Sequence, residues 1–303
     1  DSIANQQTGL GVTYSRVKQV RDIFLDTTYR RESGRCTFYQ TTTETMEEVE
    51  SLLGELNGEA FQTNMNDLWT SVQELVKDPS SSIVQGLLVQ RAGEFIERAV
   101  NIYEGMTFYQ NNLNNQIAQK VDIINDYGRK IIRLNEQIRC VEAGGVERAN
   151  DYRDTRNKLL DELGSLVNIS VSEAAFGEVA VRIENVDFIK GETCYEIALD
   201  QDETTGFYTP YWPQNASYVI GDDGRRIYDR SGAEVFRLDR EISSDKNTDI
   251  GGLKAMLLAR GDHQADYTDI EKDYSSVSES VIMNIQAEFD QLVHGVVSSM
   301  NDI

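Results

Sequence analysis

Proline is scarce in this sequence, with three residues in a chain of 303. Because proline is the residue that most reliably ends a helix, its scarcity leaves room for long helices. Histidine is scarcer still, since only His263 and His294 could supply imidazole chemistry. Neither belongs to an H-E-x-x-H pattern, and no Ser-His-Asp or Cys-His grouping is recognisable, so zinc-protease and nucleophilic chemistry lack their residues. We expect both histidines to be structural or solvent-facing.

Cysteine is also rare, and Cys36, Cys140 and Cys194 are far apart and lack C-x-x-C spacing. This pattern indicates neither a disulfide framework nor a thiolate metal site. No basic stripe is present, because the formal net charge is −22 and the acidic excess is spread along the chain. That distribution argues against nucleic acid or an anionic membrane surface as partner. No apolar run approaches the roughly 20 residues that a membrane span needs.

Motifs for metal and phosphate binding are missing as well. The segment Asp200-Gln-Asp-Glu-Thr-Thr-Gly206 has the spacing of acids found in a calcium loop, but its glycine comes one position late and Tyr211 stands where the loop needs glutamate. Gly144-Gly145 and Gly251-Gly252 lack phosphate-loop spacing. The sequence therefore predicts no catalytic, cofactor-binding or metal-binding residue, and no enzyme activity.

What the sequence does contain is helical periodicity. From Tyr14 onward, apolar residues recur at steps of three and four, until Gly54 and Gly58 mark the end of a helix. A second helix begins at Phe61, and Asp78-Pro79 stops it because the residue before proline is disfavoured in a helix.

A third helix is expected to be much longer. Ser80–Ser82 supply candidate N-caps, and no proline occurs before Gly144-Gly145, which allows a helix of about 85–90 Å. Isoleucines recur at seven-residue steps within it, which is typical of a coiled coil or an elongated bundle: Ile117, Ile124, Ile131 and Ile138. We expect Gly128 to weaken this helix locally.

Two further helical regions complete the pattern. A fourth helix is predicted from a cap at Asn150 or Asp151, and after Asp249 an apolar stripe runs from Ile270 to Met300. This last helix must return to the first bundle, since alone it would expose its apolar stripe.

Between these helices the period changes to short β-branched and aromatic runs separated by turns. Strands are expected at 179–183, 193–199, 207–212, 218–220, 226–228 and 234–238, with a hairpin turn at Asp222-Asp223-Gly224. The predicted fold is mainly α with a β-rich insert. An elongated antiparallel helical bundle comprises residues 1–168 and 249–303, and a small β-rich outer domain comprises residues 169–248.

One aromatic cluster in the insert could form a binding surface: Tyr208, Tyr211, Trp212 and Tyr218. Tyr and Trp are favoured at interfaces, and a bacterial surface domain could use them on glycans or host proteins. We favour a cross-strand core cluster instead.

Four segments resemble the family of flagellar hook-associated protein 1. They are GLGVTYSRVKQVRDIFLD at 9–26, NDLWTSVQELVKDPSSS at 66–82, DYRDTRNKLLDELGSLVNISV at 151–171 and IGGLKAMLLARG at 250–261. The last resembles the block that re-enters the helical core after the variable insert. Asn157 departs from the family pattern, which has an acid there, and the β-insert is not matched.

The resemblance implies a structural subunit of the bacterial flagellum at the junction between hook and filament. Its implied partners are copies of itself in a ring, the hook protein, the second junction protein and a cytoplasmic chaperone before export. It also implies an extracellular location after passage through the flagellar type III apparatus. In the family, terminal helical segments from both ends line the inner tube, and we expect these segments to lie outside the present sequence.

Other interpretations remain open from the sequence alone. A related flagellin or second junction protein would share the helical pattern, although the 151–171 and 250–261 segments favour the first junction protein. An adhesin-like module using the Tyr/Trp-rich insert is the alternative from another class. A hydrolase insert, as some flagellin relatives carry, is a third.

Overall fold

The computed structural model describes residues 23–54, 61–144, 148–174, 177–221 and 226–301. Several expected features lie outside these residues: the helix start near Tyr14, Gly58, Gly145 and the Asp222-Asp223-Gly224 turn. The described helices are α1 (Ile23–Leu53), α2 (Phe61–Lys77), α3 (Ser82–Glu142), α4 (Asn150–Leu166), α5 (Gly252–Arg260), α6 (Tyr267–Asp273), α7 (Ser275–Ser278) and α8 (Val281–Asn301). The described strands are β1 (Ile169–Glu173), β2 (Val179–Ile183), β3 (Val186–Lys190), β4 (Thr193–Cys194), β5 (Ala198–Gln201), β6 (Tyr208–Tyr211), β7 (Ser217–Ile220) and β8 (Arg226–Asp229).

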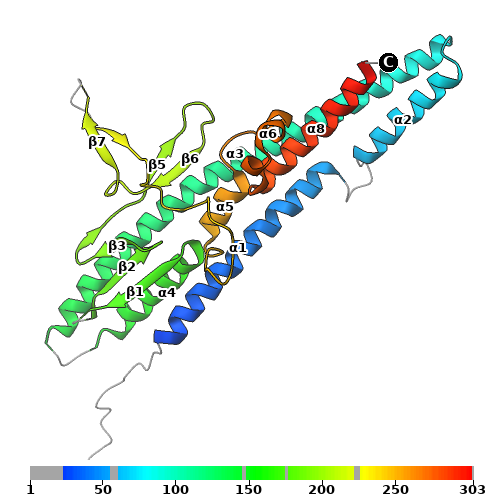
Figure 1. Cartoon of the computed structure of the whole chain (residues 1–303). Helices are drawn as coiled ribbons and strands as arrows, with labels where there is room; N and C mark the ends of the chain where they lie inside the picture. The colour runs from blue at the N-terminus through cyan, green and yellow to red at the C-terminus, as the bar shows by residue number, and fades with distance from the viewer. Residues whose placement is uncertain (1–22, 55–60, 145–147, 175–176, 222–225, 302–303) are drawn as a thin grey trace, which may run out of the picture.

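Helix α3 is the spine of the molecule. It contains 61 residues and extends for about 90 Å at about 1.5 Å per residue. Figure 1 shows α2 folded back along one end of α3 and α4 along the other, and α3 also contacts α5 and α8. The predicted helical bundle is confirmed, including the return of the last helix to it. None of the helices among the described residues is long and apolar enough to cross a membrane.

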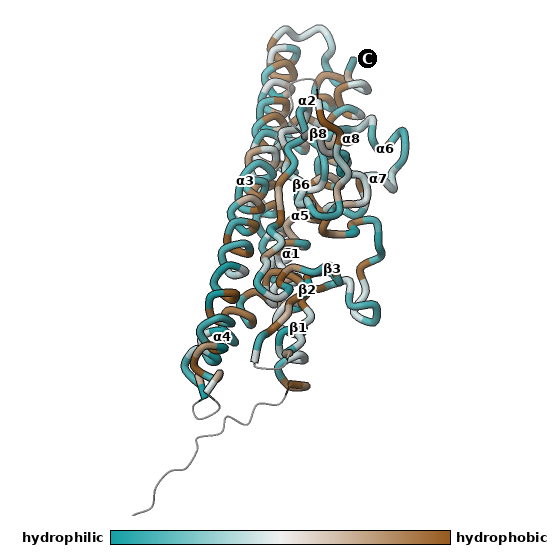
Figure 2. The backbone as a smooth tube through the Cα atoms, turned by 90° about the vertical axis from the view of Figure 1, so that its left-hand side faces the viewer, coloured by the Kyte–Doolittle hydropathy of each residue, from teal (hydrophilic) through white to brown (hydrophobic). Residues whose placement is uncertain are grey.

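The predicted isoleucine seam of α3 is fully buried. Ile117, Ile124, Ile131 and Ile138 each have 0% of their surface exposed. The first three belong to one apolar core that also includes α4, α5 and the four-stranded sheet. Figure 2 shows apolar and polar stretches that alternate along the helix.

Gly128 lies on the same seam, and its role differs from the expectation. A Cβ atom at this position would lie 2.6 Å from both Cys194 Sγ and Phe188 Cζ. Gly128 is therefore the place where strands β3 and β4 approach the helix backbone, and its cost in helix propensity is offset by this close packing.

Buried asparagines of α3 hold the β-rich segment along the helix. The side-chain amide of Asn125 donates to Ile197 O at 2.8 Å and accepts from Ile197 N at 2.9 Å. Asn114 makes the same kind of paired contact with Gly206 O and Tyr208 N, and Asn135 does so with both backbone groups of Val179. Each asparagine thus replaces a neighbouring strand as the partner of backbone groups that are buried against α3.

The strands form three antiparallel units. The order β1-β2-β3-β4 gives one four-stranded sheet, while β5-β6 and β7-β8 are two-stranded. The alternation of buried and exposed residues in β2, with Val179, Val181 and Ile183 buried, matches a sheet that is covered on one face. The fold class of a mainly helical chain with a small β insert is confirmed, whereas the division into two domains stays a prediction.

Two expected strands are wrong in extent. The 193–199 run breaks into β4 and β5, because Asn125 pairs with the intervening Ile197. The 234–238 run forms no strand beyond a single bridge between Glu234 and Tyr211. Val235 and Phe236 are adjacent yet both buried, which an alternating strand does not allow.

The apolar stripe from Ile270 to Met300 is not one helix, as was expected, but three. The Asp273 carboxylate accepts hydrogen bonds from the backbone and hydroxyl of Ser275 and begins a new turn. Ser280 Oγ donates to Ala259 O at 3.0 Å, which holds the chain against α5 just before α8. Serine and aspartate interrupt the helix because their side chains compete for backbone groups.

The expected helix caps also differ. Ser81 precedes α3 without a side-chain cap bond. Helix α4 has Ala149 as its N-cap residue, with no side-chain cap bond, so neither Asn150 nor Asp151 caps it; the N–H of Ala149 donates to Glu142 Oε1 at 3.1 Å.

Replacing Gly128 by alanine should destabilise the fold by about 1–3 kcal/mol, because the added methyl group overlaps Phe188 and Cys194. Gly86→Ala is the matched control on the same helix, where a Cβ meets nothing within 4 Å. The control should stabilise the helix by about 0.5–1 kcal/mol. Urea unfolding of both variants measures the difference, and equal effects would contradict the close packing at Gly128.

Replacing Asn125 by leucine should lower the free energy of unfolding by about 2–4 kcal/mol, since both backbone groups of Ile197 lose their partner. The control, Asn115→Leu, changes an exposed asparagine of the same helix and should have little effect. Hydrogen exchange at the Ile197 amide should accelerate in the first variant alone. An unchanged exchange rate would show that the asparagine does not protect this amide.

Candidate subunit interface

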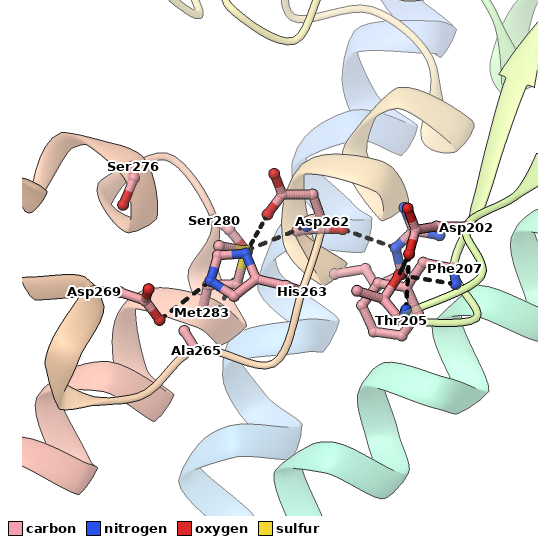
Figure 3. Close-up of polar contacts among 12 residues, drawn as sticks. Asp202, Thr205, Phe207, Asp262, His263, Ala265, Asp269, Ser276, Ser280 and Met283 are labelled. Atoms are coloured by element: carbon pink, nitrogen blue, oxygen red, sulfur yellow. Dashed lines mark hydrogen bonds and ion pairs between the residues drawn. The ribbon is translucent and has the colours of Figure 1, made fainter. Parts of the chain in front are cut away.

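His263 lies between two carboxylates in the loop that follows α5. Its Nδ1 is 2.7 Å from Asp262 Oδ1 and its Nε2 is 3.2 Å from Asp269 Oδ2 (Figure 3). Burial acts to lower the pKa of His263, but the hydrogen bonds to Asp262 and then Asp269 outweigh it and hold that pKa above its ordinary value of 6.5. Asp269 also accepts from the backbone N–H of Asp266 in the capping box of α6. The imidazole therefore connects this loop to the start of α6.

His294 has a different environment on α8. Its ring stacks on Tyr267, with 4.1 Å between ring centroids and 8° between the planes. The two histidines thus contact α6 from different elements, and each has a packing or hydrogen-bonding partner that accounts for its position.

The acidic segment 200–206 forms a turn stabilised by one aspartate. Asp202 Oδ1 accepts the backbone N–H groups of Thr204 and Thr205, both at 2.8 Å (Figure 3). Asp200 pairs with Arg230 instead of turning toward Asp202. In the part of the chain that the structure describes, no group of three or more His, Cys, Asp or Glu side chains is placed to hold a metal ion.

The aromatic cluster expected in the insert is split by the fold. Trp212 is fully buried and packs against Phe188, with ring centroids 6.3 Å apart. Tyr211 is buried as well, whereas Tyr218 lies exposed on β7. Trp212 and Tyr211 are therefore core residues, and the four aromatic side chains do not form one continuous surface.

The three cysteines are free thiols. Cys36 and Cys140 are exposed on α1 and α3, and Cys194 is half-buried against Gly128. Burial, with Glu196 as the next cause, raises the pKa of the Cys194 thiol to about 11. This thiol is a packing group rather than a nucleophile.

Arg260 joins the β5-β6 hairpin to helix α3, a contact that no sequence pattern indicates. Its Nη1 donates to Asn114 Oδ1 at 2.6 Å and to Tyr208 O at 2.9 Å, and its guanidinium lies 4.7 Å from the centroid of the Phe207 ring. Burial lowers the pKa of Arg260 to about 10. The residue remains charged at neutral pH and holds three elements together.

The surface best suited to bind another protein is an apolar groove of roughly 680 Å³ between α2 and α8, at the end of the rod. Helices α2 and α8 both pack on α3 there (Figure 1). The groove is lined by uncharged side chains throughout: Met65, Asn66, Leu68, Trp69, Val72, Gln291, Leu292, Gly295, Val296, Ser299 and Met300. We call this surface the α2–α8 groove. In a chain of which 26% is charged, eleven uncharged lining residues mark a surface different from the rest.

Large apolar side chains of the groove are open to solvent. Trp69 is 63% exposed and Leu292 is 43% exposed, although both lie over a well-packed layer. In that layer Phe61 contacts Phe95 and Phe289, with ring centroids 5.2 and 5.0 Å apart. Exposed aromatic and aliphatic residues gathered on a rigid base are typical of a protein–protein interface.

The sequence contained part of this signal. Periodicity predicts the helices that correspond to α2 and α8, but it assigns their apolar residues to the core. Trp69 stands beside the buried Leu68 and so lies off the buried stripe of α2. An apolar residue such as Trp69, which lies outside the buried stripe of α2, indicates that this helix has a second contact surface besides the one that packs on α3.

The pH dependence of stability should report on His263. Because its pKa is raised in the folded state, its stabilising contribution is fully present below about pH 6.5 and is lost as the pH rises through the folded-state pKa. His263→Gln should therefore destabilise the chain more at about pH 5.5 than at about pH 8.5. Urea unfolding of both proteins at the two pH values measures this, and an equal loss at both would contradict the role of the two carboxylates.

Comparison with known proteins gives a consistent result. The family model for the "Flagellar hook-associated protein FlgK helical domain" matches residues 46–303. Flagellar hook-associated protein 1 of Bacillus subtilis (strain 168) is 32% identical over 167 residues, which are 55% of this chain and 32% of that protein. The corresponding proteins of Escherichia coli (strain K12) and Salmonella typhimurium are 25% identical over 63% of this chain, and 35% and 34% of their own lengths.

A solved structure shows the same fold. The flagellar hook junction protein FlgK from Burkholderia pseudomallei aligns with a TM-score of 0.58 at 17% identity, over 84% of this chain and 42% of that one. The chain spans about a third of the length of the curated relatives that it matches. With the family model covering most of the sequence, the chain belongs to the family of flagellar hook-associated proteins that share the FlgK helical domain.

Proposed function

We propose that the chain is the helical core of a structural subunit at the junction between the flagellar hook and filament. The observation that carries the proposal is the α2–α8 groove, an uncharged and exposed surface on a rigid rod in a member of this family. The subunit acts by packing, with no chemical step. This agrees with the prediction that the chain is not an enzyme, because the matched family consists of flagellar hook-associated proteins.

The partners follow from this position. Copies of the same subunit would pack side by side in a ring, with the hook protein on one side and the second junction protein on the other. A cytoplasmic chaperone would hold the subunit before export through the flagellar type III apparatus, and its final location would be the extracellular flagellum. In this arrangement the helical rod lies toward the assembly, and the β-rich segment 169–248 faces outward.

The groove suits such packing for a physical reason. Copies that each carry a net charge of −22 repel one another, so their contacts need surface without acidic side chains. The α2–α8 groove offers that surface, and burying Trp69 and Leu292 would add the apolar area on which stable association depends.

The adhesin-like alternative retains little support. Its aromatic surface is reduced to Tyr218 on β7, beside the exposed Val219 and Ile220, and the half-buried Tyr208 on β6. The buried positions of Trp212 and Tyr211 favour a structural role for the rest of the cluster.

A genetic experiment tests the junction role. Deleting the gene should leave hooks without filaments and release flagellin into the medium. Normal filaments in the deletion strain would overturn the proposal.

Complementation with the full-length gene tests the α2–α8 groove. Trp69→Asp with Leu292→Asp should fail to restore filaments, because two charges enter an uncharged contact surface. The matched control, Val219→Asp with Ile220→Asp, places two charges on the exposed strand β7 and should restore filaments and swimming. Both changes affect exposed residues, so secretion of a folded subunit should be retained. Filaments formed equally well by both variants would remove the groove from the assembly interface.

A further inference from the structure

A polar cavity of roughly 410 Å³ lies where the β2-β3 turn, the 232–237 segment and the 246–248 segment meet α5. We call it the Lys254 cavity. All but three of its fourteen lining residues carry a polar or charged side chain, the exceptions being Val186, Val235 and Gly232. Its size is within the range of small-ligand sites.

The charges that line this cavity have the opposite balance to the chain as a whole. Four cationic residues, Arg237, Arg240, Lys246 and Lys254, stand against two acidic ones, Glu184 and Glu234. In a chain with a net charge of −22, a local excess of positive charge marks a place where an anion is attracted rather than repelled.

Lys254 is the innermost of these cations. It is 4% exposed, and its Nζ donates to Thr248 O at 2.7 Å. That is the only hydrogen bond of its ammonium group among the described residues, where it also forms no ion pair. An ammonium group has three donors, and a buried charge is ordinarily paired with an opposite charge. Burial lowers the pKa of Lys254, while Glu184, Asp249 and Asp239 act on it through space without a direct contact.

Two arginines lie at the edge of the cavity without a direct polar contact to any described residue. Arg237 and Arg240 are exposed, and neither makes a hydrogen bond or an ion pair with any residue that the structure describes. Lys246, by contrast, is engaged by Glu241 at 2.6 Å. A free guanidinium matches the geometry of a carboxylate or phosphate, with which it forms paired hydrogen bonds.

We propose that the Lys254 cavity binds the oxyanion group of a ligand, a carboxylate or a phosphate, between the buried Lys254 ammonium and the guanidinium groups of Arg237 and Arg240. The oxyanion would supply the missing acceptors for Lys254 and neutralise the excess positive charge. It could come from a small dissolved anion or from an acidic side chain of a second copy, since the chain carries 51 acidic residues. This site is separate from the α2–α8 groove and does not rest on the junction role.

The first experiment titrates the protein with inorganic phosphate, with sodium chloride at equal ionic strength as the reference, and follows backbone amide shifts by NMR. Saturable shifts at Thr248 and Asn185 are expected with phosphate only. Arg237→Gln with Arg240→Gln should weaken phosphate binding about tenfold or more, because charged hydrogen-bond donors are lost at exposed positions where folding is unaffected. Lys254→Met should have a comparable effect, and Lys158→Gln, which removes an exposed charge on α4, should have none.

The second experiment separates the two sources of the oxyanion by sedimentation over a range of protein concentrations. Saturable phosphate binding by a monomer supports a small anion. Self-association that phosphate reverses and the double arginine variant prevents supports a carboxylate of a second copy. Equal shifts in phosphate and chloride, or unchanged phosphate affinity in the double arginine variant, would overturn the proposal.

Discussion

Three buried asparagines on one helix determine where the β-rich part of the molecule lies. In Asn114, Asn125 and Asn135, the side-chain amide donates one hydrogen bond to a backbone carbonyl of the β-rich segment and accepts another from a backbone N–H. Backbone groups buried against a helix cannot pair with water or with the helix itself, so they need such partners. Arg260 donates to the first of these asparagines and links α5 to the same line of contacts. These hydrogen bonds therefore position the β-rich insert along α3.

This arrangement gives the molecule a shared core at the end of α3 where the sheet lies. Isoleucines of α3, leucines of α4, the sheet and Trp212 all belong to one buried cluster. Gly128 permits this by letting Phe188 and Cys194 reach the helix backbone. At the other end of α3 a separate cluster forms with α2 and α8, where Phe61, Phe95 and Phe289 lie beneath the open groove. The four-stranded sheet therefore covers the apolar residues at one end of the helical rod, whereas an apolar surface stays exposed at the other end.

The acidic net charge of the chain explains why the two proposed binding surfaces differ from the rest of the molecule. A strongly acidic subunit can associate with its own kind only where acidic side chains are absent or are met by cations. The α2–α8 groove meets the first condition, because its lining is uncharged. The Lys254 cavity meets the second, because it combines a buried ammonium with two guanidinium groups that contact no other described side chain through a hydrogen bond or ion pair. These surfaces lie on different elements and would make different kinds of contact, one through apolar burial and the other through oxyanion binding.

By itself the sequence determined the helices, the isoleucine seam and the position of the β insert, because period, proline and glycine act locally along the chain. It also indicated the family, and three of the four segments that carry the resemblance lie within residues 46–303, which the family model matches. Only the tertiary structure decided what the buried polar residues contact. The helical period turns Asn125 toward the seam side and Asn115 away from it, but the backbone of Ile197, which Asn125 contacts, lies 72 residues further along the chain. The same holds for the break of the last stripe at Ser280, the absence of a strand at Val235 and Phe236, and the uncovered Trp69. Each depends on which segments, far apart in the chain, come to lie against that position.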